Sequence, residues 1–331
     1  MEILKKIFIN ILRFGVTIFL LIFLFKQVDE KVLIEVIRGS NKPLLIVAFI
    51  SMFFTYALCI FRWDMLLRAA KMHLPLKRVV ISAAGGAFFS LFLPSTIGGD
   101  LMRSIDLAVH TKRSHEVVAT VLLDRLSGYI GLVIVTLFAV LFGWNLVRDN
   151  FVILLCVFVI TFVLAAILML LFNKHLYSKI NKLLHSPQAG KIREFIKDLH
   201  KEMHIFRHHR STVINNLLVS VSVQLIAPLT AYLIALSMGI KINLAYFFIF
   251  VPIIGAITLL PISLGGLGLR DAITVFFFAK AGVGKDMAFA MSLVSFSFIL
   301  VLGLAGGILY ALTVRHRRIQ YHKPHHIPLH P

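Results

Sequence analysis

Charged residues are scarce in this sequence. Asp, Glu, Lys and Arg make up 15% of its 331 residues, whereas a typical soluble domain carries about 25%. Long polar segments are missing as well, because the longest one between apolar stretches covers only residues 173–211. A folded domain usually needs about 50 residues or more. This sequence therefore leaves no room for a soluble catalytic domain that binds a nucleotide sugar or an aminoacyl-tRNA.

Motifs for nucleotide binding and nucleophilic catalysis are also absent. The sequence has no Gly-x-x-x-x-Gly-Lys-Ser/Thr loop, no Gly-x-Gly-x-x-Gly fingerprint and no Gly-x-Ser-x-Gly elbow. Its two cysteines, Cys59 and Cys156, both lie in apolar runs, which excludes a disulfide framework and a cysteine-based zinc site. We expect no ATPase activity, no metal, no cofactor and no catalytic residue, and hence a protein that is not an enzyme.

Apolar residues dominate instead. They make up 59% of the sequence and gather in runs of roughly 20 residues, the length that crosses about 30 Å of hydrocarbon. The sequence predicts an all-α polytopic membrane protein with about six full spans. These cover Phe14–Phe25, Pro43–Phe61, Val117–Phe142, Phe151–Phe172, Val213–Met238 and Met287–Leu312.

The basic residues predict how the chain is oriented. They outnumber acidic residues by 34 to 15, for a net charge of +19, and they gather between the apolar runs. That distribution is typical of cytoplasmic loops, so we expect no nucleic-acid partner. The segment 62–78, the loop 173–211 and the His-rich tail 313–331 are basic, which places them, and both chain termini, on the cytoplasmic side of the cell membrane. The link 143–150 is expected outside.

A ten-residue motif occurs twice. Residues 94–103, PSTIGGDLMR, align without gaps to residues 261–270, PISLGGLGLR, at an offset of 167 residues. The same offset carries the spans Pro43–Phe61 and Val117–Phe142 onto two later spans. We therefore expect a single transmembrane domain, 1–312, that contains two repeats at about 43–142 and 210–312.

Each motif interrupts a short apolar segment, Val79–Leu93 or Leu244–Leu260. Proline ends a helical hydrogen-bond ladder, and Gly-Gly permits positive φ and close backbone approach. When loops are assigned to faces by charge, each interrupted segment enters and leaves on one face, and the two use opposite faces. The sequence thus predicts two re-entrant or broken helical elements in an inverted repeat, with a binding site at the breaks. A helix that begins after Gly-Gly would point its amides at an anion.

Charged residues in or beside the apolar segments come as neighbouring pairs: Arg62 with Asp64, Asp100 with Arg103, Asp124 with Arg125, and Arg270 with Asp271. A charge in the bilayer core is costly unless it is paired or hydrated. Because arginine suits phosphate, one hypothesis is a cavity in which arginines bind a lipid phosphate. The alternative is interhelical salt bridges or headgroup anchoring. The candidate binding residues are Arg62, Pro94, Ser95, Thr96, Gly98, Gly99, Asp100, Arg103, Asp124, Arg125, Pro261, Ser263, Gly265, Gly266, Gly268, Arg270 and Asp271.

Three motifs follow one another along the chain: LPSTIGGD at 93–100, LLDRLSG at 122–128 and PISLGGLGLRD at 261–271. Together they resemble the lysylphosphatidylglycerol synthase transmembrane-region family, also called flippase-like, over nearly the whole chain. Asp271 stands where Glu is more usual in that family, and the aminoacyl-transfer domain of the full-length synthase has no counterpart in this sequence. The resemblance implies lipid translocation, or a partner role beside a lipid-modifying enzyme, but not transferase activity.

Three functions stay open at this point. The first, which we favour, is flipping or scrambling of an anionic phospholipid or a polyprenyl-phosphate-linked lipid between leaflets without ATP. The second is an intramembrane enzyme that acts on lipid headgroups, with Asp100 or Asp124 as the base. The third is a structural subunit that recruits a separate lipid-modifying enzyme through the loop 173–211.

Overall fold

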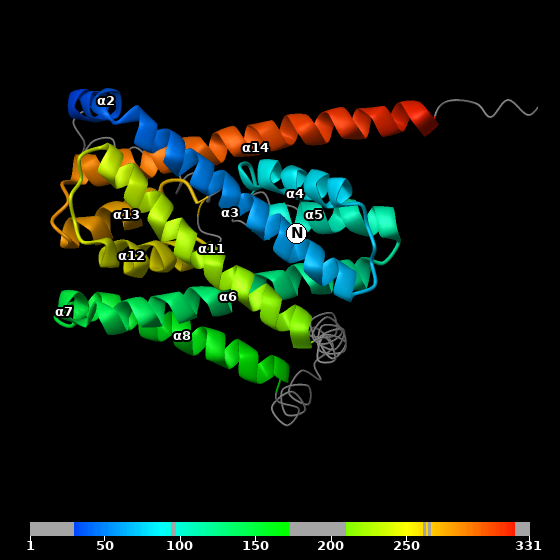
Figure 1. Ribbon diagram of the computed structural model, residues 1–331, viewed down its shortest axis with the longest axis horizontal. Coiled ribbons are helices and arrows are strands. Elements are labelled where there is room, and N and C mark those ends of the chain that lie inside the picture. Colours follow the sequence, from blue (N-terminus) through cyan, green and yellow to red (C-terminus); the bar gives the residue numbers. More distant parts are fainter. Residues whose placement is uncertain (1–29, 94–96, 173–209, 261–262, 264–265, 322–331) are drawn as a thin grey trace, which may run out of the picture.

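The structure is a computed structural model that describes residues 30–93, 97–172, 210–260, 263 and 266–321. Over these residues the regular secondary structure is helical (Figure 1). The helices are α2 (Glu30–Gly39), α3 (Lys42–Ala69), α4 (Leu76–Ser90), α5 (Ile97–Thr111), α6 (Ser114–Phe142), α7 (Trp144–Val147), α8 (Phe151–Phe172), α11 (Arg210–Ser237), α12 (Leu244–Ile257), α13 (Leu269–Lys280) and α14 (Lys285–Tyr321).

Among the described residues, five helices are long and apolar enough to cross a membrane: α3, α6, α8, α11 and α14. They confirm five of the predicted spans, while Phe14–Phe25 lies outside the described residues. α3 runs on past Phe61 to Ala69, and in this part of the helix the buried Arg62 and Asp64 each form an ion pair. α14 likewise continues to Tyr321, into the segment that we assigned to the tail. The chain is an all-α polytopic membrane protein.

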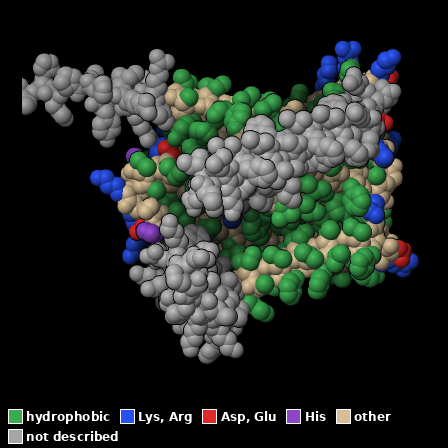
Figure 2. All heavy atoms as spheres, turned by 180° about the vertical axis from the view of Figure 1, so that it is seen from behind, with side chains coloured by type: hydrophobic (Ala, Val, Ile, Leu, Met, Phe, Trp, Pro, Cys, Tyr) green, Lys and Arg blue, Asp and Glu red, His purple; other side chains and the backbone are tan. Residues whose placement is uncertain are grey.

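The outer surface fits this assignment. Figure 2 shows hydrophobic side chains across the middle of the bundle and charged side chains at its two ends. Large apolar side chains along the spans are exposed, among them Phe53, Phe138 and Phe158. Such a surface is favourable in hydrocarbon, where apolar side chains need no polar covering.

The two interrupted segments form helical hairpins. α4 and α5 run antiparallel, since Arg78 pairs with Asp106 near one end and Gly86 approaches Gly99 near the other. α12 and α13 form the second hairpin, with phenylalanine rings along their interface. Each hairpin begins and ends at one end of the bundle, and the two start from opposite ends (Figure 1).

The two halves of the described chain run in opposite directions. α3 and α11 are antiparallel neighbours: the Asn41 amide donates to the Ser237 carbonyl at 2.7 Å. Toward the other end, Asn216 Nδ2 donates to the Arg62 carbonyl at 2.9 Å. Each half has the order span, hairpin, span, from α3 to α6 in the first and from α11 to α14 in the second. The hairpin helix α4 of the first half packs on the span α14 of the second half, and the hairpin helix α12 of the second half packs on the span α6 of the first. This exchange of contacts is what two repeats predict, and their inversion across the membrane stays a prediction.

Glycines line the contact between α4 and α14. A Cβ atom on Gly306 would lie 2.7 Å from the Ala84 carbonyl oxygen, and one on Gly307 would lie 2.3 Å from the Phe88 ring. Small residues let membrane helices approach closely, so this seam fixes the first hairpin against a helix of the other half.

Gly306→Ala is expected to destabilise the protein, because the new methyl group meets the backbone of α4 and the helices must separate. Overpacking of this kind typically costs about 1–3 kcal/mol. Gly255→Ala in α12 is the matched control, since nothing lies within 4 Å of that position and alanine is the better helix former. Thermal unfolding in detergent should show a lower midpoint for Gly306→Ala only. Equal midpoints would contradict the tight seam.

Candidate functional site

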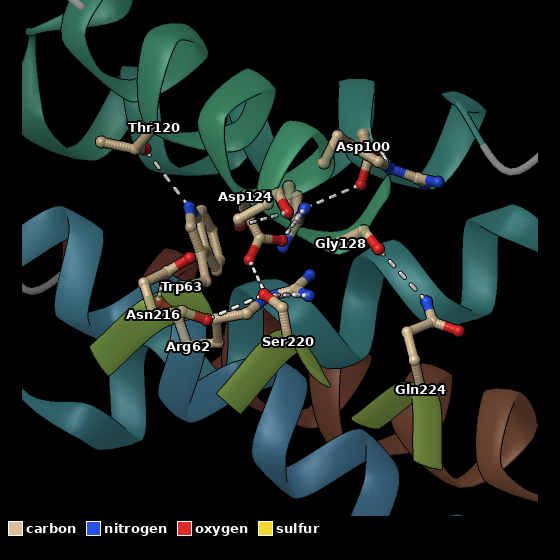
Figure 3. A network of polar contacts seen from close by, with 12 residues as sticks. Arg62, Trp63, Asp100, Thr120, Asp124, Gly128, Asn216, Ser220 and Gln224 are labelled. Atoms are coloured by element: carbon tan, nitrogen blue, oxygen red, sulfur yellow. Dashed lines mark hydrogen bonds and ion pairs between the residues drawn. The ribbon is translucent and has the colours of Figure 1, made fainter. Parts of the chain in front are cut away.

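Five charged side chains meet where α3, α5 and α6 converge, and we call them the Arg/Asp network: Arg62, Asp100, Arg103, Asp124 and Arg125. Asp124 lies between two arginines. Arg62 Nε is 2.6 Å from its Oδ1, and Arg103 Nη2 is 3.0 Å from its Oδ2. Asp100 joins the network through Arg103 Nη2 at 2.9 Å and through Arg125 Nε, which donates to its Oδ2. Figure 3 shows Arg62 and Asp124 pointing toward each other.

The network is buried and carries an excess of one positive charge, from three arginines and two aspartates. Side-chain exposure is 4% for Asp124 and 8% for Arg62, and it rises to 26% for Arg125. Burying a charge is costly unless it is paired, and among the described residues the three arginines share the two carboxylates of Asp100 and Asp124. The arrangement is therefore suited to hold one anion, with Arg125 as its most exposed member.

Polar residues of α11 hold Arg62 in place (Figure 3). Arg62 Nη1 donates to Ser220 Oγ at 3.1 Å, and Asn216 Nδ2 donates to the Arg62 carbonyl. One turn further, Gln224 Nε2 donates to the Gly128 carbonyl at 3.4 Å. Sequence reasoning missed Asn216 and Ser220. Asn216, Ser220 and Gln224 follow one another at intervals of four residues in an apolar helix, and this spacing is the signal for a polar stripe.

Trp63 packs against the network from the next position of α3. Its Nε1 donates to Thr120 Oγ1 at 3.2 Å, and the Arg103 guanidinium carbon lies 4.5 Å from the centre of its ring. A cation over an aromatic face is stabilised by the ring quadrupole. Trp63, fully buried, thus helps to orient Arg103.

The glycines of the first motif serve close packing. A Cβ atom on Gly99 would lie 2.4 Å from the Gly86 carbonyl oxygen. Neither Gly98 nor Gly99 has positive φ, and α5 begins at Ile97 rather than after Gly-Gly, so that expectation is wrong for this motif. Asp100 lies in the first turn of α5, where the helix dipole favours its carboxylate. The candidates Pro94, Ser95 and Thr96 lie outside the described residues.

The second motif has a different geometry. Gly266 and Gly268 have φ of 80° and 75°, and α13 begins after them at Leu269. The fully buried Asp271 caps this helix: its Oδ2 accepts from the Gly268 amide at 2.9 Å, and its Oδ1 accepts from Ser292 Oγ at 2.5 Å. The protein's own carboxylate thus occupies the helix N-terminus at which we expected an external anion.

Arg270 lies beside this cap. Its Nη2 is 3.5 Å from Asp271 Oδ1, and its guanidinium carbon lies 5.0 Å from the centre of the Phe296 ring. Ser263 is buried, and its Oγ has no hydrogen-bond partner within the part of the chain that the structure describes. Pro261 and Gly265 lie outside that part. Within the described residues, the ion pairs and side-chain hydrogen bonds of Arg270 and Asp271 are with each other, with α13 and with Ser292 of α14, and none of them joins the Arg/Asp network.

Two of the four expected charge pairs are wrong. Asp64 pairs with Arg68 one turn further along α3, at 2.6 Å, and leaves Arg62 to Asp124. Asp124 and Arg125 turn to different partners, because side chains at adjacent helix positions do not face each other. Asp100 with Arg103 and Arg270 with Asp271 do pair.

Comparison with known proteins covers most of the chain. A UPF0104 membrane protein of Methanothermobacter thermautotrophicus is 24% identical over 299 residues, which span 82% of this chain and 86% of that protein. The family model described as "Lysylphosphatidylglycerol synthase TM region" matches residues 10–307, which include both hairpins and the Arg/Asp network. The chain therefore belongs to the lysylphosphatidylglycerol synthase transmembrane-region family.

Proposed function

We propose that this protein moves an anionic phospholipid or a polyprenyl-phosphate-linked lipid between the leaflets of the cell membrane without ATP. The Arg/Asp network is the observation that carries the proposal. It is a buried cluster with one excess positive charge, among helices whose outer surface is apolar. Ionisable residues inside a membrane bundle mark substrate or ion pathways by default. Arginine in such a place suits the phosphate of a lipid headgroup.

The path across the membrane comes, in this proposal, from two re-entrant hairpins in an inverted repeat. Three observations support this arrangement. α3 and α11 are antiparallel, α4 and α12 each pack on a span of the other half, and the two hairpins start from opposite ends of the bundle. Broken helices at corresponding positions of inverted repeats give each face its own access to a central site. The end that carries Lys71, Lys77 and Lys112 is assigned to the cytoplasm, together with both chain termini.

Leaflet exchange in liposomes tests the proposal. Fluorescent phosphatidylglycerol and a fluorescent polyprenyl-phosphate lipid are each placed in both leaflets with the purified protein, and a membrane-impermeant quencher reports the fraction that reaches the outer leaflet. Arg125→Ala should slow exchange by about tenfold or more, the loss of one hydrogen-bonded charge contact. Arg270→Ala tests the second motif in the same assay.

Arg148→Ala is the matched control. Arg148 is 56% exposed and pairs at 3.6 Å with the exposed Asp149 outside the network, so exchange should stay at the wild-type rate. Every variant is first checked by size-exclusion chromatography. If folded wild-type protein exchanges neither lipid, translocation is refuted, and an enzyme or a subunit that lacks its partner becomes the better reading.

A further inference from the structure

A second buried charge pair lies on α5, beyond the Arg/Asp network. Asp100, Arg103 and Asp106 are spaced three residues apart, so they share one side of the helix. Asp106 pairs with Arg78 of α4, whose Nη2 is 2.8 Å from its Oδ2, and the two side chains are 12% and 5% exposed. Six residues of helix separate Asp106 from Asp100, a rise of about 9 Å. The pair lies toward the end of the bundle at which α4 begins.

Arg78 uses only part of its hydrogen-bonding capacity. Its Nη2 donates to the Asp106 carbonyl oxygen at 3.2 Å. Its Nε and Nη1 are buried without a hydrogen-bond partner in the described part of the chain, and Asp106 Oδ2 has an ion pair but no aligned hydrogen bond. The large majority of buried side-chain polar atoms in proteins have a hydrogen-bond partner, so such an arginine needs a reason. Two of its three nitrogens thus have no acceptor among the described residues.

The position of Arg78 on α4 also favours an anion. Arg78 lies in the first turn of α4, because its amide donates to the Pro75 carbonyl just before the helix. The N-terminal end of a helix carries positive potential, which destabilises a cation and stabilises an anion. The dipole of α4 therefore does not stabilise an arginine here, whereas it would stabilise a phosphate bound to that arginine. The exposed Lys77 precedes it at the same end.

Asp106 has a second partner. Tyr310 of α14 donates to Asp106 Oδ1 at 3.2 Å, and its ring lies against Gly85 of α4. When Arg78 turns to another acceptor, the Asp106 carboxylate keeps this hydrogen bond. The pair is thus built to open without leaving the carboxylate unbonded.

We propose that Arg78 binds the phosphodiester of a lipid headgroup before it reaches the Arg/Asp network. The headgroup enters at the end where α4 begins, displaces Asp106 from Arg78, and moves along α5 to the level of Asp100, a rise of about 9 Å, where Arg103 and Arg125 lie. This assignment rests on the proposed function, because the network is the next binding position on the same path.

Three variants separate phosphate binding from a structural role: Arg78→Gln, Asp106→Asn and the double variant. In phosphatidylcholine liposomes with fluorescent phosphatidylglycerol, Arg78→Gln and the double variant should each slow exchange by about tenfold, the loss of one charged hydrogen-bond contact. Asp106→Asn keeps Arg78 and removes its competitor, so exchange by protein that is folded and monodisperse in size-exclusion chromatography should not fall. If the double variant, which has no unpaired charge, exchanges like wild type, the pair is structural and the proposal is overturned.

Lipid retention by purified protein gives a second readout. Native mass spectrometry of detergent-purified protein should show more bound phosphatidylglycerol for Asp106→Asn than for wild type, and less for Arg78→Gln and the double variant. Equal retention in all four would overturn the proposal, as would displacement of the lipid by inorganic phosphate, which would assign Arg78 to a free anion. Failure of wild-type exchange with these retention changes intact would refute translocation and not the Arg78 site.

Discussion

Replacing Asp124 with asparagine is expected to be the most damaging single change among the described residues. Asp124 holds Arg62 at 2.6 Å and Arg103 at 3.0 Å in surroundings where it and Arg62 are only 4% and 8% exposed. Breaking a buried ion pair by removing one partner costs about 3–5 kcal/mol, because the other charge stays buried without compensation. The yield of monodisperse protein and the thermal midpoint in detergent should both fall sharply.

The double variant Arg62→Gln/Asp124→Asn should recover much of that loss. It leaves the net charge of the network at +1, as in the wild type, because Arg103 and Arg125 still share Asp100. Asp149→Asn is the control: its side chain is 90% exposed, and exposed ion pairs contribute little. An Asp124→Asn variant that unfolds at the wild-type midpoint would mean that the network does not hold the helices together.

Hydropathy was enough to predict the five spans that the described residues contain, because an apolar run of roughly 20 residues is long enough to cross the hydrocarbon core. The hairpins followed from proline, glycine and loop charge taken together. The sequence did not predict why each glycine is needed, because a Gly-Gly pair is compatible both with close helix packing and with a positive φ. Gly99 is needed because Gly86 lies across the hairpin, whereas Gly266 is needed for its backbone angle.

The residues of the site were easier to predict than their contacts. Arg62, Asp100, Arg103, Asp124 and Arg125 were all singled out as charges in apolar surroundings, and the structure brings them together. Their partners depend on how α3, α5 and α6 cross, which no short-range pattern reveals. Arg78 was counted only among the basic residues of a cytoplasmic segment, although hairpin packing buries it. The positive-inside rule uses only the number of Lys and Arg residues near the ends of the spans, so it carries no information on whether one of them is buried.

The two hairpins should be reached by reagents from opposite faces of the membrane. Four exposed lysines flank them: Lys77 and Lys112 at the α4–α5 hairpin, and Lys241 and Lys280 at the α12–α13 hairpin. Single cysteines are placed at these positions after both native cysteines are changed to serine. In intact cells, a charged maleimide should label positions 241 and 280, and it should label 77 and 112 only after permeabilisation.

Each pattern of labelling has one structural meaning. Labelling of 77 and 112 from opposite faces would show that α4 and α5 together cross the membrane once, which contradicts a re-entrant hairpin. Labelling of all four positions from one face would contradict the inversion of the two halves. The effect is close to all or none, because a charged reagent does not pass the hydrocarbon core. The labelling pattern does not depend on folding defects, because substitutions at exposed surface positions usually change the free energy of unfolding by less than about 0.5 kcal/mol.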